Sequence, residues 1–351
     1  MKFCVWYNFP MLPVERENPE ENLAVFIGVS SMSFFRCASE QKCSFQSYPF
    51  AYSENLFSHY LDEKAFYERI LSEVMGVADV FQMPNLYITS FARPLWLDDS
   101  HKGYTDLKAV LETTDHFNPV LIDGLMAYAG GEFLYDCDFA PYAKSEELVD
   151  FMSNLNVYPF VCSTDDQERT ATDELPQRLV SSPKPQLPVV FTGGRFLRDG
   201  AYLLALNMVK QTGVFDLYMD TENRFVPFEL LRLHRPQLYD ALAAEVGYQR
   251  IGALLNIPGE TECLIKDLLG ATRFVKAQDN DLTIIPLVGE DGAEITVRNG
   301  KGYKLEARVR GGVLGAVVDT RDKSRARFGA ESELRDTNRW EAVIDAAMKG
   351  L

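Results

Sequence analysis

Residues 188–196 read Pro-Val-Val-Phe-Thr-Gly-Gly-Arg-Phe, and an amphipathic segment follows at 201–210. The β-branched and aromatic run predicts a buried strand that ends at Thr192. The glycine pair Gly193-Gly194 permits a tight turn and lets a ligand approach the main chain. A helix that begins shortly afterwards offers unpaired N–H groups to an anion. The stretch therefore predicts a strand, a turn and a helix, and the turn is either a ligand site or an ordinary structural turn.

The composition is that of an ordinary globular protein. The chain has 351 residues, of which 46% are hydrophobic and 25% charged. It holds no apolar run of about 18 residues, the length that a membrane-spanning helix needs. The net charge of −16 argues against general nucleic-acid binding. The six cysteines show no CxxC pair, and we expect reduced, mostly buried thiols in a cytoplasmic protein.

The charge is distributed unevenly along the chain. Residues 298–327 carry nine Lys or Arg against three Asp or Glu, a local net charge of +6. Such a segment is either a docking face for an acidic protein partner or an ordinary solvated surface. In the first case Arg308, Arg310 and Arg325 are the candidate partner-binding residues. The pattern does not identify the partner, which could be a second copy of the chain in a homo-oligomer.

Strand and helix signals alternate over most of the chain. Residues 1–22 are expected to form an N-terminal arm, and 23–258 an α/β region with two lobes that meet near 115–120. Residues 259–351 are expected to form a β-rich module closed by a helix. The strands are predicted at 23–29, 34–39, 44–52, 85–91, 119–125, 132–135, 157–162, 189–192, 214–219, 272–277, 281–287, 294–297, 303–309 and 313–318, and the main helices at 62–75, 145–155, 201–210, 227–233, 236–245 and 338–348.

Recognisable catalytic motifs are missing. The sequence has no G-x-x-x-x-G-K-[ST] phosphate loop, no G-x-G-x-x-G and no H-E-x-x-H. The acidic candidates for a Mg²⁺ ligand are Asp123 and the pair Asp136 and Asp138, which a strand would turn to one face. No motif in the sequence identifies a nucleophile or a general base, so the sequence does not decide whether the protein is an enzyme. If the protein is active, we expect an ATPase.

Three segments together resemble one family. They read Val189-Val-Phe-Thr-Gly-Gly-Arg195, Gly213-Val-Phe-Asp-Leu-Tyr-Met-Asp220 with Phe225-Val-Pro-Phe-Glu-Leu-Leu231, and Val309-Arg-Gly-Gly-Val-Leu-Gly-Ala-Val-Val-Asp-Thr-Arg321. In this order they resemble the glutamate mutase MutL-type proteins of the actin-like ATPase superfamily, over about residues 188–345. The resemblance implies an α/β, actin-like (ribonuclease H-like) fold with two lobes, here with a small C-terminal β-rich module.

The resemblance also implies a nucleotide site between the lobes. Thr192, Gly193, Gly194 and Arg195 would contact the adenosine of ATP or ADP, and Ser30 and Ser31 the phosphates, with Mg²⁺ near Asp123. The chain departs from the family pattern where a hairpin normally reads Asp-x-Gly-[Ser/Thr], because Gly28 occupies the aspartate position and Ser30 the glycine position. Loss of the metal-ordering carboxylate predicts weak or no ATP hydrolysis.

Two classes of function follow from this pattern. The first is a MutL-related, nucleotide-binding accessory protein that acts on a protein partner. The alternative is a pseudo-ATPase scaffold or adaptor that works without nucleotide in a multiprotein assembly.

Overall fold

The structure, a computed structural model, describes most of the chain. It covers residues 21–28, 31–39, 42–49, 83–90, 101–123, 126–134, 187–197, 201–242, 247–287, 292–322 and 331–350, with single residues at 65, 68, 93, 94 and 97. The N-terminal arm and the elements expected at 145–155 and 157–162 lie outside these ranges. No helix within them is long and apolar enough to cross a membrane.

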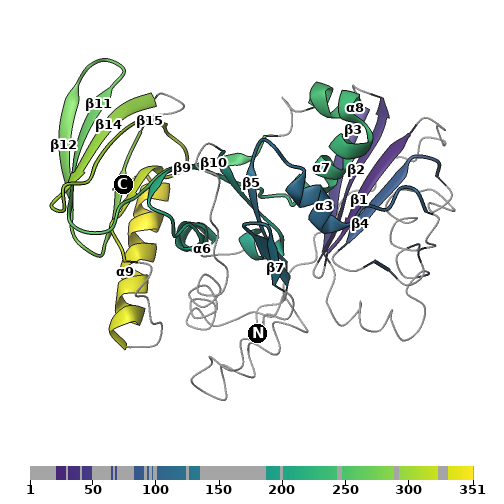
Figure 1. Cartoon of the computed structure of the whole chain (residues 1–351), viewed down its shortest axis with the longest axis horizontal. Coiled ribbons are helices and arrows are strands. Elements are labelled where there is room, and N and C mark those ends of the chain that lie inside the picture. Colours follow the sequence, from purple (N-terminus) through teal and green to yellow (C-terminus); the bar gives the residue numbers. More distant parts are fainter. Residues whose placement is uncertain are drawn as a thin grey trace.

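A four-stranded sheet forms one end of the molecule (Figure 1). Its order is β3-β2-β1-β4, with antiparallel β1–β2 and β2–β3 pairs and a parallel β1–β4 pair. The three strands expected between 23 and 52 therefore form a meander. The strands are β1 (Asn22–Ile27), β2 (Ser31–Ser39), β3 (Lys42–Pro49) and β4 (Leu86–Ser90).

An eight-stranded sheet forms the middle of the molecule. Its order is β13-β16-β10-β9-β8-β5-β6-β7. The strands β5, β8 and β9 run parallel, whereas β6 and β7 continue from β5 as an antiparallel meander. The strands are β5 (Asn118–Asp123), β6 (Met126–Ala129), β7 (Glu132–Leu134), β8 (Val189–Thr192), β9 (Gly213–Met219), β10 (Gln249–Asn256), β13 (Leu282–Ile285) and β16 (Gly315–Asp319).

Both sheets begin with the same plan. In each, three consecutive strands form an antiparallel meander, and a later strand pairs in parallel with the first of the three. Two lobes built on one plan are what the two-lobed actin-like fold requires. The predicted α/β fold class is therefore confirmed.

A second four-stranded sheet forms the C-terminal module at the other end (Figure 1). Its order is β12-β11-β14-β15, all antiparallel. The strands expected at 281–287 and 313–318 do not belong to it, since β13 and β16 join the eight-stranded sheet. The module strands are β11 (Thr261–Asp267), β12 (Thr272–Ala277), β14 (Gly292–Asn299) and β15 (Lys304–Arg310).

The eight-stranded sheet is covered on both faces near β10 and β16. On one face, Leu255 and Val318 pack with Ile265 and Val297 of the module, so two sheets lie face to face. On the other face, the neighbouring residues pack against helices α6 (Ala201–Met208) and α9 (Glu331–Met348). The order of layers is therefore sheet, sheet, helix.

Helix α7 (Phe225–His234) follows strand β9 of the second lobe but packs on the sheet of the first. Phe225 and Val226 pack in one buried cluster with Phe26 of β1, and Phe228 packs in another with Phe35 of β2. The short helices α3 (Leu107–Glu112) and α8 (Pro236–Leu242) lie beside it. Helix α7 is therefore the element that joins the two lobes.

Polar contacts close the C-terminal end of this joint. The Arg235 guanidinium donates to Asn22 Oδ1 at 2.8 Å, to the Tyr87 hydroxyl at 2.9 Å and to Asn85 Oδ1 at 2.6 Å. The neighbouring His234 ring stacks on Tyr87 with 4.2 Å between centroids. One arginine thus ties the end of α7 to both parallel strands of the first sheet.

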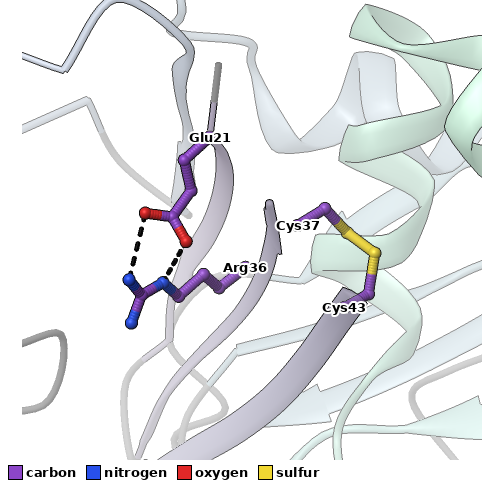
Figure 2. The surroundings of a disulfide bond; sticks show 4 residues. All are labelled: Glu21, Arg36, Cys37 and Cys43. Atoms are coloured by element: carbon purple, nitrogen blue, oxygen red, sulfur yellow. Dashed lines mark hydrogen bonds and ion pairs between the residues drawn. A yellow bond between two sulfur atoms is a disulfide. The ribbon is translucent and has the colours of Figure 1, made fainter. Parts of the chain in front are cut away.

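A disulfide joins Cys37 and Cys43, which corrects the expectation of reduced thiols for this pair (Figure 2). The two residues face each other in register on β2 and β3. The signal in the sequence was two cysteines six residues apart in a predicted meander. Beside them, Arg36 binds Glu21 through two hydrogen bonds, one of them 3.0 Å between Nη2 and Oε2. Because disulfides are typical of oxidising compartments, the pair gives no support to the cytoplasmic location, which stays a prediction.

Cys263 on β11 is a free, buried cysteine, as expected. Burial raises the pKa of its thiol to about 11. This thiol is therefore protonated at neutral pH and unreactive.

The disulfide predicts sensitivity of stability to reductant. Because it closes a short loop, its loss should lower the free energy of unfolding by about 2 kcal/mol. Urea unfolding with and without dithiothreitol measures the difference. The variant Cys43→Ser should show no effect of dithiothreitol, and equal sensitivity in that variant would contradict the pairing.

His234 predicts a loss of stability in mild acid. Its Nε2 lies 2.8 Å from the Thr105 hydroxyl, and burial together with the Arg235 charge lowers the pKa of the imidazole. The pKa of this imidazole in the unfolded chain is about 6.5. As the pH falls below that value, the folded protein therefore binds fewer protons than the unfolded chain. The stabilisation is complete above about pH 6.5 and is lost toward the lower folded-state pKa. Urea midpoints between about pH 5 and 8 should depend less on pH in His234→Gln, and an unchanged dependence in this variant would contradict the role of His234.

Candidate functional site

Three parallel strands bring polar side chains to one edge of the eight-stranded sheet. β5 ends at Asp123, β8 ends at Thr192, and Asp220 directly follows β9. All three side chains are almost fully buried. In open α/β sheets, ligands bind outside the carboxyl ends of the parallel strands. This edge is therefore the candidate site.

The Asp220 carboxylate is the centre of the edge. Its Oδ2 accepts the Phe225 N–H at 2.7 Å and the Thr192 hydroxyl at 2.8 Å. Its Oδ1 accepts the Arg224 N–H at 2.9 Å and the Glu222 N–H at 3.4 Å. The carboxylate thus caps the N-terminus of α7, where the N–H groups and the helix dipole favour an acceptor of negative charge.

Burial is the main influence on the Asp220 carboxyl and raises its pKa. The hydrogen bonds from Arg224, Phe225 and Thr192 act in the opposite direction. The main chain bends around the carboxylate with Asn223 at φ 58°, and this buried amide lies 3.4 Å from the Thr192 hydroxyl. The result is a compact polar cluster whose hydrogen bonds lie within the protein.

Gly193 is required by packing within the sheet. Its φ is +102°, and a Cβ atom there would lie 2.2 Å from the Ile122 carbonyl oxygen of β5. The close approach that this glycine permits is to a neighbouring strand. Gly194 then begins a short 3₁₀ helix, η3 (Gly194–Leu197), which contains Arg195 and leads toward α6.

The predicted phosphate side is only partly within the described residues. Ser31 begins β2, whereas Ser30 lies outside the described residues. At this edge of the first sheet, Ser90 ends β4 and its hydroxyl lies 3.5 Å from that of Tyr104. Ile27 pairs with Ser90, so the hairpin after β1 and the end of β4 share one edge.

The metal candidate Asp123 lies at the end of β5 and is fully buried. Within the described ranges, no group of three or more His, Cys, Asp or Glu side chains is arranged to hold a metal ion. Asp136 and Asp138 lie outside those ranges. Asp123 is thus the one predicted metal candidate whose position the structure describes.

The predicted partner residues lie in the C-terminal module. Arg308 and Arg310 are exposed on β15, and Arg325 lies outside the described residues. The structure therefore separates Arg308 and Arg310 from the edge that holds Asp123 and Thr192.

The family-like segment at 309–321 runs away from this edge. Gly311 and Val313 bond to Arg250 beside the end of β9, whereas Asp319 and Arg321 lie toward the opposite edge, because β16 runs antiparallel to β9. Both Arg321 and Asp319 are buried, and the Arg321 guanidinium binds both Asp319 carboxylate oxygens, at 2.8 and 2.7 Å. It also lies over the Trp340 ring of α9, 4.5 Å from the centroid. The Asp-x-Arg pattern therefore fastens the terminal helix to the sheet.

Sequence analysis missed the part that Asp220 plays. The signal was present, since Asp220 follows a predicted strand and precedes a predicted helix by a few residues. An aspartate there commonly accepts the first N–H groups of the helix. Its bond to Thr192, 28 residues earlier, has no local signal.

No family model matches the chain, and no curated protein matches it in sequence. Two solved structures are similar in fold. One is the activator of the 2-hydroxyisocaproyl-CoA dehydratase from Clostridium difficile with bound ADPNP, with a TM-score of 0.36 and 10% identity over 65% of this chain and 98% of that one. The other is the ethanolamine utilization protein EutJ from Carboxydothermus hydrogenoformans, with a TM-score of 0.32 and 9% identity over 62% and 91%. At this level of similarity neither structure assigns a ligand or a partner to this chain.

The cluster predicts that Asp220→Asn destabilises the fold. The amide group of Asn would point N–H donors at the main-chain N–H donors of α7. One of these buried main-chain groups would then have no acceptor. We expect a loss of about 2–3 kcal/mol in the free energy of unfolding, measured with urea. The matched control is Asp216→Asn on β9, the strand that Asp220 follows. This substitution removes a half-exposed ion pair to Arg250 and should cost less than about 1 kcal/mol. Equal effects of the two substitutions would contradict the role of Asp220.

Proposed function

We propose that the protein is an actin-like accessory protein that binds ATP or ADP, hydrolyses ATP weakly or not at all, and acts on a protein partner. The observation that carries this proposal is the meeting of Asp123, Thr192-Gly193 and Asp220 at the carboxyl ends of three parallel strands. The relation to MutL-type proteins rests on the sequence segments alone and remains part of the proposal.

The adenosine side of the proposed site is formed by Thr192, Gly193, Gly194 and Arg195. Because the Thr192 hydroxyl donates to Asp220, contacts to a nucleotide here would come from the main chain of the glycines. Ser30 and Ser31 would contact phosphate. Asp123 suits Mg²⁺, since this ion commonly takes one or two carboxylates together with phosphate oxygens and water.

Weak hydrolysis follows from the carboxylates that are present. The hairpin after β1 has Gly28 where a metal-ordering aspartate would be needed. Asp220, the other buried carboxylate at the edge of the second sheet, accepts hydrogen bonds from α7 and Thr192. Phosphoryl transfer depends on metal positioning and charge stabilisation, so binding without efficient turnover is the activity that these residues favour.

A nucleotide-independent scaffold is the second candidate. Two observations favour it. The Thr192 hydroxyl donates to Asp220, and the close approach of the Ile122 carbonyl accounts for a glycine at position 193 without a ligand. In this case the polar edge only holds the two lobes together, and the partner-binding residues Arg308, Arg310 and Arg325 carry the function.

Calorimetric titration with ADP and with ATP plus Mg²⁺ separates the two candidates. We expect a dissociation constant below about 1 mM. Gly194→Asp should lose at least about tenfold in affinity, because the added side chain fills the approach of the adenosine to the main chain and its charge repels the anionic nucleotide. Gly300→Asp, at an exposed turn with open space around it, is the matched control and should bind normally.

Two outcomes decide against the proposal. Absence of binding at millimolar nucleotide would leave the scaffold. Phosphate release at rates of typical enzymes, about 1 per second or more, would show that hydrolysis is intact and would contradict the weak turnover.

A further inference from the structure

The sheet of the C-terminal module has one buried and one open face. In β11 the inward Cys263 and Ile265 are buried against the eight-stranded sheet, whereas Leu264 and Lys266 between and after them are exposed. The same alternation continues in β14 and β15. We call the exposed side of β12-β11-β14-β15 the outer face.

One half of the outer face is apolar. Leu264 and Phe274 lie opposite each other in register on β11 and β12, with 46% and 60% of their surfaces exposed. The tip of the same hairpin carries Leu268 at 57% and Leu269 at 95% exposure. Scattered exposed hydrophobic residues need no explanation, but four on one hairpin are typical of an interaction surface.

The other half of the outer face is basic. Arg298 on β14 and Arg308 and Arg310 on β15 are exposed, and Lys266 lies on the same side of β11. Within the described part of the chain, none of these four side chains makes an ion pair. The same face also carries Glu262 opposite Arg298, Glu294 opposite Arg308, and Glu306, which pairs with Lys304. With Lys276 and Lys304 the exposed cations of this face number six against three carboxylates, so in a protein with a net charge of −16 it keeps a local excess of positive charge, which attracts negative charge.

The two halves adjoin across the sheet. Leu264 pairs with Thr296 of β14, which pairs with Glu306 of β15. The flanking row on one side holds Glu262 and Arg298, and the row on the other side holds Lys266, Glu294 and Arg308. A bound segment that covers Leu264 and Phe274 therefore reaches Arg298 or Arg308 within the width of two further strands, about 10 Å.

We propose that the outer face docks a segment of a partner protein that carries aromatic or aliphatic side chains beside Asp or Glu residues. The apolar side chains pack on Leu264 and Phe274, and the carboxylates bind the guanidinium groups of Arg298, Arg308 and Arg310. Burial of the apolar pair supplies affinity, and charge-assisted, bidentate hydrogen bonds supply specificity. This inference specifies the partner in the proposed function and rests on it, but it does not depend on nucleotide.

Peptide display on the full-length protein tests the chemistry of the partner. A random library of about 12 residues, the length of two strands, is selected on the immobilised chain and counter-selected on the double variant Leu264→Ser, Phe274→Ser. We expect enrichment of peptides that combine a surplus of Asp and Glu with an aromatic or aliphatic residue. Enrichment of basic peptides, or no enrichment over the counter-selection, overturns the proposal.

Fluorescence anisotropy of the selected peptides then locates the site. Affinity should fall at least about tenfold in Leu264→Ser, Phe274→Ser and in Arg308→Glu, Arg310→Glu. The matched controls are Leu197→Ser, Met348→Ser, which removes equally exposed apolar residues, and Lys102→Glu, Lys349→Glu, which makes the same charge change at exposed lysines elsewhere. Equal losses in variants and controls overturn the proposal.

The result is separable from that for nucleotide. Calorimetry with ADP on the same outer-face variants should give the affinity of the unaltered protein, because the altered residues lie in a different sheet from Thr192. Loss of peptide binding with retained ADP binding supports the outer face. Peptide binding that persists in all variants contradicts the proposal that the outer face is the docking site. It has no bearing on the proposed nucleotide site.

Discussion

The arrangement of the two lobes depends on one buried carboxylate. Asp220 holds the first N–H groups of α7 and the hydroxyl of Thr192 at the same time. Its own N–H donates to the Phe191 carbonyl, which continues the β8–β9 pairing by one residue. Because α7 packs on the sheet of the first lobe, the start of that helix fixes where the first lobe stands relative to the second. A buried carboxylate is costly unless its oxygens accept several hydrogen bonds, and here four donors surround it.

This use of Asp220 bears on what the edge can do chemically. A catalytic carboxylate must be able to bind a metal ion or to move a proton, and the oxygens of Asp220 already accept bonds from α7 and Thr192. Asp123, one strand away from β8, does not take part in that cap. The use of Asp220 in the cap therefore supports the proposed binding of nucleotide without efficient turnover. For the same reason, we expect a substitution of Asp220 to change the free energy of unfolding and a substitution of Gly194 to change the affinity for nucleotide.

Sequence patterns predicted the elements better than their partners. The run that ends at Thr192 and the alternation at 272–277 and 294–309 have local periods, so these strands were recognisable, as was the class of fold. The strands β10 and β11 were missed. Whether β13 joins the module or the larger sheet depends on pairing with β16, and no local pattern encodes that choice. The Cys37–Cys43 disulfide depends on the register between β2 and β3. The sequence predicted that these strands form a meander but did not determine their register. The Asp220–Thr192 bond likewise joins residues that only the tertiary fold brings together. Ser30 and Arg325 stay predictions.

The family-like segments have packing reasons of their own. Gly193 faces the Ile122 carbonyl, and a Cβ at Gly312 would lie 2.7 Å from the main chain of β10. At Gly252 it would lie 2.0 Å from the Gly315 carbonyl oxygen, so β10 and β16 approach more closely than any side chain permits. Asp319 and Arg321 bind each other beneath Trp340. Because packing within this fold accounts for these glycines and for the buried ion pair, the segments bear on architecture more than on the chemistry of a ligand. The chemistry of this protein is therefore better sought outside these packing contacts, at the polar edge that holds Thr192 and on the outer face of the module.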